Sequence, residues 1–308
     1  MTTWLHPGLF VLLAAALGGL MPVQAVASEV ELMGSNGPKQ MTALLPIDDV
    51  ELAYQVFGAP SPATPLVMIM GYGGLMEMWP PTIIETLARE RQVIVFDHRG
   101  MGHSSSSDQA YSIARFAADT HALLQALGVE RAQVLGWSMG SFVAQELALQ
   151  HPEQVTKLVL LSGSCGGPSA IWPDPEVWAR LLDLSGTLEV RVQRMFENLF
   201  PPAWLAITLD PLQVFPPITA PIEDAHLRRQ GETLRAWPGV CDRLAEISAE
   251  TLLMTGTDDI VIPSANSRLM AERIQGASLI QLHGGGHGFF YQEPERTARL
   301  LGAFLAGE

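Results

Sequence analysis

Short, continuous apolar runs recur along the chain from about residue 50 and are separated by stretches with helical periodicity. Runs of three to five apolar residues are typical of strands that a parallel sheet buries on both faces. One earlier segment, Val50–Phe57, alternates apolar and polar residues and predicts a half-exposed strand. The later predicted strands are Leu66–Met70, Val93–Phe96, Gln133–Leu135, Leu158–Leu161, Leu252–Met254 and Ser278–Leu282.

Helical patterns fill the intervals between these strands. Alternation of buried strands and amphipathic helices specifies a three-layer α/β domain, in which helices flank a mostly parallel central sheet. We therefore expect one α/β domain over residues 28–308. The predicted helices cover roughly Glu77–Glu90, Ile113–Leu127, Met139–Gln150, Ser264–Ile274 and Pro294–Leu305.

The segment at about 163–247 breaks this rhythm. It is rich in proline and aromatic residues and contains several short helical patterns separated by Pro-containing turns. A structureless loop of this length is uncommon inside a compact domain. We therefore expect an inserted helical cap.

The N-terminus differs from the rest of the chain. No charged residue occurs from Pro7 to Ser28, and an apolar core at Leu9–Leu17 leads to the small residues Ala25 and Ala27. This pattern predicts a signal peptide over residues 1–27, cleavage near Ala25 or Ala27, and a secreted or periplasmic protein. The alternatives are an uncleaved membrane anchor and a start assigned too far upstream. The apolar stretch is interrupted before the ~20 residues that a membrane span needs, so we expect no stable membrane insertion after cleavage.

Composition limits the partners. A chain of 308 residues with 48% apolar and 16% charged residues can bury a large core. The formal net charge of -14 argues against nucleic acid or an anionic membrane surface as partner. Cysteine and histidine show no metal-binding spacing, so we expect no metal.

The two cysteines, Cys165 and Cys241, leave two states open. In an exported protein they could form a disulfide that ties the ends of the cap together. The alternative is two buried free thiols, to which we give slight preference.

The sharpest chemical signal is Gly136-Trp137-Ser138-Met139-Gly140, which follows a predicted buried strand and precedes a predicted helix. This is the context of a nucleophile elbow, in which a tight strand-to-helix turn exposes the serine hydroxyl. The flanking glycines remove side chains that would clash there. We expect Ser138 to be a nucleophile.

A serine hydroxyl needs a base to take its proton. In enzymes with such an elbow, an acid and then a histidine follow the serine along the chain. His287 lies in a glycine-rich loop after a predicted strand, whereas the nearby His283 is expected to be structural. Asp258 and Asp259 both follow another strand and could orient the imidazole. His98, His103, His121, His151 and His226 are expected at the surface or in turns.

The oxyanion of the tetrahedral intermediate needs backbone donors. One is expected to be the N–H of Met139, directly after the nucleophile, and the other the N–H of Tyr72 in the loop Met70–Gly74. Aromatic residues near the predicted site indicate an apolar pocket. We expect Gly71, Trp137 and Phe289 to contribute to it.

Four segments together resemble the α/β-hydrolase superfamily, from about residue 42 to the end. In that family the acid is the aspartate of a Gly-x-x-Asp-x-x-Val/Ile-Pro segment, a position that falls on Asp259. The Asp-x-Arg-Gly turn is structural there, so Asp97 and Arg99 are not expected to be catalytic. Met70 stands where members commonly have histidine, which implies altered pocket detail with the backbone donors kept. The segments are Met70–Gly74, Asp97–Ser104, Gly136–Gly140, and Gly256–Pro263 with Gly286–His287.

The resemblance implies a serine hydrolase without a cofactor. The elbow and the Met-Gly loop are similar to those of methylesterases, enol-lactonases and cofactor-free haloperoxidases. We expect hydrolysis of a small to medium hydrophobic carboxylic ester or lactone through an acyl-enzyme. The alternatives are a C–C bond hydrolase, a thioesterase or a perhydrolase on the same triad, and a non-catalytic ligand-binding receptor.

Overall fold

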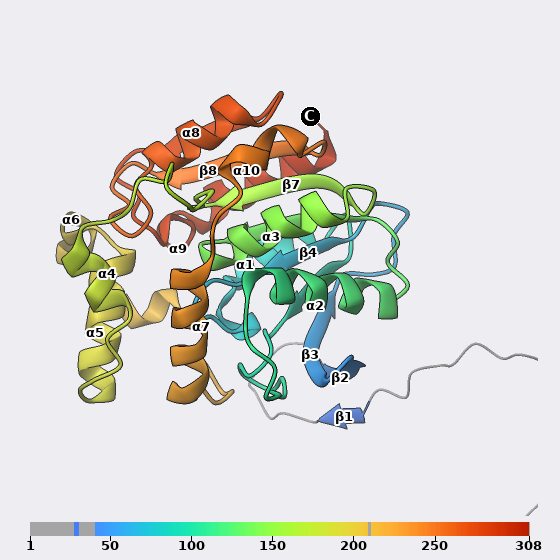
Figure 1. Cartoon of the computed structure of the whole chain (residues 1–308), viewed down its shortest axis with the longest axis horizontal. Coiled ribbons are helices and arrows are strands. Elements are labelled where there is room, and N and C mark those ends of the chain that lie inside the picture. Colours follow the sequence, from blue (N-terminus) through green and yellow to red (C-terminus); the bar gives the residue numbers. More distant parts are fainter. Residues whose placement is uncertain (1–27, 31–40, 209–210, 308) are drawn as a thin grey trace, which may run out of the picture.

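The computed structural model describes residues 28–30, 41–208 and 211–307, and a mostly parallel sheet of nine strands forms its centre (Figure 1). The strand order is β1-β2-β3-β5-β4-β6-β7-β8-β9. Pairs from β1 to β5 along this order are antiparallel, and the remaining pairs are parallel. The strands are β1 Ser28–Val30, β2 Thr42–Ile47, β3 Val50–Phe57, β4 Leu66–Ile69, β5 Val93–Phe96, β6 Ala132–Trp137, β7 Val155–Leu161, β8 Glu250–Gly256 and β9 Ser278–Leu282.

Helices cover both faces of this sheet, so the predicted three-layer α/β architecture is confirmed. They are α1 Pro81–Leu87, α2 Ile113–Ala126, α3 Met139–Gln150, α4 Pro175–Leu181, α5 Leu188–Leu199, α6 Pro202–Ile207, α7 Asp224–Ala236, α8 Ala265–Arg273, α9 Phe289–Gln292 and α10 Pro294–Ala306. Short 3₁₀ segments lie at Met76–Met78, Pro211–Val214 and Cys241–Glu246.

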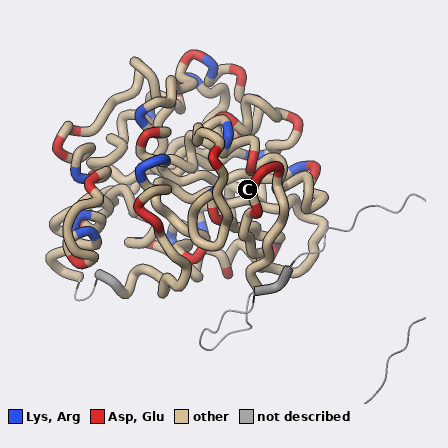
Figure 2. Tube along the Cα trace, turned by 60° about the horizontal axis from the view of Figure 1, so that its bottom comes forward, with Lys and Arg blue, Asp and Glu red and all other residues tan. Residues whose placement is uncertain are grey.

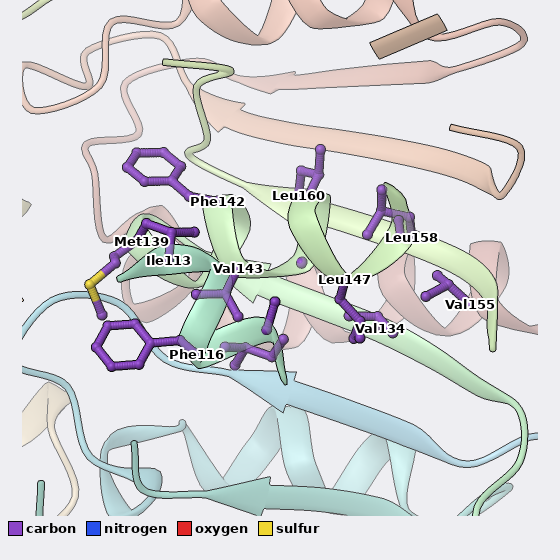
Figure 3. Close-up of a cluster of buried hydrophobic side chains, with 14 of the residues drawn as sticks. Ile113, Phe116, Val134, Met139, Phe142, Val143, Leu147, Val155, Leu158 and Leu160 are labelled. Atoms are coloured by element: carbon purple, nitrogen blue, oxygen red, sulfur yellow. The ribbon is translucent and has the colours of Figure 1, made fainter. Parts of the chain in front are cut away.

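Two apolar layers hold the helices on the sheet. On one face, α3 packs over β6 and β7, and α2 packs beside α3 and over β2. Side chains such as Phe116, Val143 and Leu160 form one cluster there (Figure 3). The other layer contains residues of α1 and α10. Every residue of β4, β5 and β6 is buried, which explains why these strands are continuous apolar runs in the sequence.

The register of the parallel strands aligns their carboxyl ends. Ile69 at the end of β4 pairs with Gly136 in β6, and Trp137 pairs with Leu161 at the end of β7. The loops that follow these strands therefore leave the sheet at one edge. This edge carries the residues singled out for chemistry.

Between β7 and β8 the chain forms α4 to α7, and these helices lie together to one side of the sheet (Figure 1). The end of this segment is anchored on the core. The ring of Trp237 stacks on Phe142 of α3 at 4.5 Å between centroids, and its indole N–H donates to Glu146 at 3.0 Å. We refer to the α4–α7 segment as the cap.

A disulfide joins Cys165 and Cys241, at the two ends of the cap. The structure thus has the bonded form and not the free thiols that we preferred. Backbone pairing brings these ends together, because the N–H of Val240 donates to the carbonyl of Cys165 at 2.7 Å. The sequence left both states open, because a separation of 76 residues along the chain does not reveal this backbone pairing.

The predicted signal peptide, residues 1–27, lies outside the described residues. In the described part, no helix has both the length and the apolar character required to cross a membrane. Acidic and basic residues are interspersed over the surface, and no continuous basic face is visible in Figure 2.

The turn at Asp97–Ser104 is a buried scaffold, as the resemblance implied. Arg99 forms an ion pair with Asp119 at 2.6 Å, and Asp97 accepts the N–H groups of Met76 and His103. Burial raises the pKa of Asp97 to about 7. His98 was expected at the surface or in a turn, and it begins a turn, since its carbonyl accepts the N–H of Met101 at 2.9 Å. It does not lie at the surface, because its ring is buried between Phe96 and Phe116. Burial lowers the pKa of His98 to about 4.

Candidate active site

Ser138 lies in a strained turn between β6 and α3. Its backbone has φ 56° and ψ -121°, a conformation that costs a non-glycine residue about 1–3 kcal/mol. The turn is possible only because Gly136 and Gly140 have no Cβ. A Cβ at Gly136 would lie 2.1 Å from the carbonyl oxygen of Gly140, and one at Gly140 would lie 2.1 Å from that of Ile69. The geometry is that of a nucleophile elbow.

His287 and Asp259 form a buried pair. Nδ1 of His287 lies 2.8 Å from Oδ2 of Asp259, and both side chains are almost completely shielded from solvent. The other carboxylate oxygen accepts the N–H groups of Val261 and Ile262 at 2.9 and 2.8 Å. The carboxylate is therefore fixed on both oxygens and holds the ring so that Nε2 faces away from it. Asp258 is exposed and accepts only the hydroxyl of Thr257 at 2.8 Å.

The backbone of the histidine loop is held from three sides. The indole N–H of Trp137 donates to the carbonyl of His287 at 3.0 Å, and the hydroxyl of Ser162 donates to the same oxygen at 3.3 Å. From the cap, the carbonyl of Leu199 accepts the N–H of Gly288 at 2.9 Å. The sequence pattern indicated only a pocket role for Trp137, and it gave no indication of a role for Ser162.

Ser138 and His287 line the same cavity. A hydrogen bond also brings them close together, because Trp137, the residue before Ser138, donates its indole N–H to the carbonyl of His287. Within the described residues, the hydroxyl of Ser138 forms no hydrogen bond with the imidazole. Hydrogen bonds of this kind are often long without substrate and shorten in the Michaelis complex.

The two amides predicted to hold the oxyanion have no acceptor among the described residues. Met139 is the first residue of α3, where amides have no partner within the helix. The amide of Tyr72 donates to no acceptor among the described residues, and the adjacent Gly73 amide donates to Gln230 of α7 at 2.9 Å. A cap helix thus anchors this loop, a role of Gln230 that the sequence did not indicate. Gly71 is close to the serine, because a Cβ there would lie 3.0 Å from Cβ of Ser138.

A cavity of about 360 Å³ extends from Ser138 under the cap. Its walls are mainly apolar, with Trp137 of β6, Tyr291 of α9, and Trp178, Leu184 and Met195 of the cap among them. Burial raises the pKa of Tyr72, another lining residue, to about 12, so its phenol stays protonated at neutral pH.

Two predicted pocket residues do not line this cavity. Gly71 is buried against the elbow, where a Cβ would lie 3.1 Å from the carbonyl oxygen of Trp137. Phe289 is completely buried in the apolar layer that contains α10. Its neighbour Tyr291 lines the cavity instead, because residues two apart on a helical turn point in different directions.

Among the described residues, no group of three or more histidine, cysteine or acidic side chains is arranged to hold a metal ion. The reactive groups brought to the sheet edge are those of a Ser-His-Asp constellation.

Comparisons with known proteins place the chain in a family. A family model described as alpha/beta hydrolase fold matches residues 64–203. A relative from Azorhizobium caulinodans, named "Putative carbamate hydrolase RutD", is 35% identical over 260 residues, which cover 83% of this chain and 95% of the relative. The chain belongs to the α/β-hydrolase family. This family membership makes it a hydrolase.

Solved α/β hydrolases share its fold. A hydrolase from Pseudomonas aeruginosa PA01 superposes with a TM-score of 0.74 at 30% identity, covering 87% of this chain and 98% of that one. Est816, described as an N-acyl homoserine lactone degrading enzyme, superposes with a TM-score of 0.69 at 28% identity, covering 85% of this chain and 99% of that one.

Proposed function

We propose that this α/β hydrolase is a serine esterase or lactonase that cleaves small to medium hydrophobic carboxylic esters through an acyl-enzyme. The buried pair of His287 and Asp259, held at 2.8 Å beside the strained Ser138, carries the proposal. A receptor that only binds a ligand has no chemical use for such a pair.

In the first half-reaction, Oγ of Ser138 attacks the ester carbonyl while Nε2 of His287 takes the hydroxyl proton. Asp259 accepts the Nδ1–H and stabilises the imidazolium. The amides of Tyr72 and Met139 donate to the oxyanion. The carbon–oxygen bond then breaks, and His287 gives its proton to the leaving alcohol.

In the second half-reaction, a water gives its proton to His287 and attacks the acyl-serine. The bond to Oγ breaks, the acid leaves, and the proton returns to Ser138. In a lactone the alcohol and the acid stay in one molecule.

The cavity supports a hydrophobic substrate. Its mainly apolar walls and its volume of about 360 Å³ suit a substrate larger than a simple carbamate. The relatives named as carbamate hydrolases make carbamate cleavage the second candidate, and the degradation of an acyl lactone by Est816 supports lactones.

A panel of p-nitrophenyl esters, aliphatic lactones and carbamates would test the proposal. We expect turnover of medium-chain esters or lactones by the wild type, weaker turnover of carbamates, and loss of turnover in Ser138→Ala. Labelling of Ser138 by a fluorophosphonate is expected as well. Unchanged turnover in Ser138→Ala would refute the mechanism.

We also propose that the enzyme is exported after removal of residues 1–27. The Cys165–Cys241 disulfide supports this, since such bonds persist in oxidising compartments. Cleavage after Ala27 would leave β1, which begins at Ser28, intact. Fractionation and N-terminal sequencing of the native protein would test export. An uncleaved N-terminus in the cytoplasmic fraction would contradict it.

A further inference from the structure

One polar side chain of the cap lies close to the histidine loop. Asn198 of α5 is 3% exposed and lines the cavity. The next residue, Leu199, accepts the amide of Gly288, which directly follows His287. Asn198 therefore approaches the cavity from the side on which His287 lies.

The orientation of the Asn198 amide is determined by Arg180 of α4. Nε of Arg180 donates to Oδ1 of Asn198 at 2.6 Å. A guanidinium only donates hydrogen bonds, so the amide oxygen must face Arg180 and Nδ2 must face away from it.

Nδ2 of Asn198 donates to no acceptor among the described residues. The Nδ2 atom is also not among the fully enclosed polar atoms that have no partner. Asn198 lines both this cavity and a second, smaller one formed with Asp259. The cavity walls are mainly apolar, with Leu199 and Met195 among them, and Arg180, Arg191 and Arg194 line the cavity as well. Asn198 is thus an oriented amide in the wall of the cavity that His287 also lines.

We infer that Asn198 determines specificity by donating to an acceptor oxygen in the alcohol part of the substrate. This inference rests on the proposed function. His287 protonates the leaving alcohol, so that part of an ester lies on the histidine side of the cavity, where Asn198 is. The substrate class is an ester of a hydrophobic acid whose alcohol carries an ether or carbonyl oxygen.

A buried hydrogen-bond donor that lacks an acceptor is unfavourable. A substrate that supplies the acceptor is therefore expected to have a higher kcat/KM than an apolar substrate of the same shape. We expect the gain to be about tenfold in kcat/KM, the factor that one hydrogen bond typically provides. A shape-matched pair of substrates isolates this effect. The hexanoate esters of 2-methoxyethanol and n-butanol differ only in one ether oxygen in place of a methylene.

The experiment compares kcat/KM for this pair in the wild type and in three variants. Asn198→Leu removes the donor with little change in size, and Arg180→Met frees the amide to turn. Arg191→Met is the matched control, since Arg191 also lines the cavity but pairs with Asp224 at 2.8 Å. Comparing ratios between variants cancels the intrinsic difference in ester reactivity.

We expect the methoxyethyl-to-butyl ratio to fall about tenfold in Asn198→Leu, to fall partly in Arg180→Met and to stay unchanged in Arg191→Met. Turnover of the butyl ester by Asn198→Leu shows that this variant is folded. A wild-type ratio equal to that of Asn198→Leu, with both esters cleaved, overturns this inference alone. A wild type that cleaves no ester overturns the proposed function as well.

Discussion

The indole N–H of Trp137 donates to the carbonyl of His287 at 3.0 Å, and the two rings lie 5.4 Å apart. The residue before the predicted nucleophile therefore holds the backbone of the predicted base. Since Ser138 follows Trp137 directly, this bond relates the two reacting groups through a single residue of β6.

Replacing Trp137 by Phe keeps an aromatic wall but removes this bond. We expect kcat to fall about tenfold, as for the loss of ~1.4 kcal/mol, with KM changed less than threefold. Trp79→Phe is the matched control, because Trp79 is equally buried and its indole N–H has no partner among the described residues. Equal losses of kcat in both variants would contradict a role in positioning.

Asp259→Asn should lower kcat by about 10⁴, because an amide no longer selects the correct imidazole tautomer. The amide oxygen still accepts the N–H groups of Val261 and Ile262, so the fold should be kept. The neighbouring Asp258→Asn should retain kcat within a factor of about two. Steady-state kinetics gives kcat for the two variants, and circular dichroism checks that both are folded. A larger loss of kcat in Asp258→Asn than in Asp259→Asn would assign the acid to Asp258.

Because the backbone of Ser138 is strained, removing the Cβ of this residue should increase the stability of the protein. Ser138→Ala and Ser138→Gly should both be inactive. The glycine variant should be more stable than the alanine variant by about 1 kcal/mol, since glycine adopts φ 56° without strain. Urea unfolding measures this difference. Equal stability, or a less stable glycine variant, would show that the turn stores no strain.

The disulfide closes a long loop. In the chain-entropy model, such a crosslink stabilises the folded state by about 4 kcal/mol, because it restricts the unfolded chain. We expect the double variant Cys165→Ala and Cys241→Ala to lose roughly this free energy of unfolding. Reducing agent should destabilise the wild type similarly and leave the double variant unchanged. A wild type that is insensitive to reductant after confirmed reduction would contradict the prediction.

Burial of His98 predicts a loss of stability in acid. The pKa of His98 is lowered from 6.5 to about 4. Between these two pH values the imidazole is protonated in the unfolded chain but stays neutral in the folded protein, and this favours unfolding. The free energy of unfolding of the wild type should therefore fall relative to that of His98→Gln as pH drops from 6.5 to 4. Gln keeps a donor for the carbonyl of Met70.

Asp97 is present in both proteins of this comparison, so its raised pKa cancels from the difference. His283→Gln serves as the control, because His283 is exposed. Denaturant unfolding at several pH values gives the curves. A difference between wild type and His98→Gln that is constant with pH would contradict the burial argument.

The sequence predicted the bounds of strands and helices well where the apolar pattern fitted only one kind of secondary structure. The bounds of β3 and α3 agree with the structure, since each has an unambiguous period. β2 was missed, because Pro46 and a mixed pattern of burial hide its period. The choice of Asp259 over Asp258 came from a family motif, and the structure places Asp259 on the imidazole.

The remaining misses concern directions and distances that a linear pattern does not contain. Phe289 is close to His287 along the chain, yet its side chain points into the core. His98 lies in a turn, a context typical of surface residues, but this turn is enclosed by two phenylalanine rings. Asn198 and Gln230 gave no signal at all, because their roles depend on how the cap folds back over the sheet.

The bond from the amide of Gly288 to the carbonyl of Leu199 has a practical consequence for re-engineering this enzyme. A foreign lid grafted in place of α4–α7 would bring its own main chain against the loop that carries His287. A graft that keeps native residues 199–201 should leave the imidazole in place and change only the substrate preference. A graft that also replaces these residues should change substrate preference and turnover together.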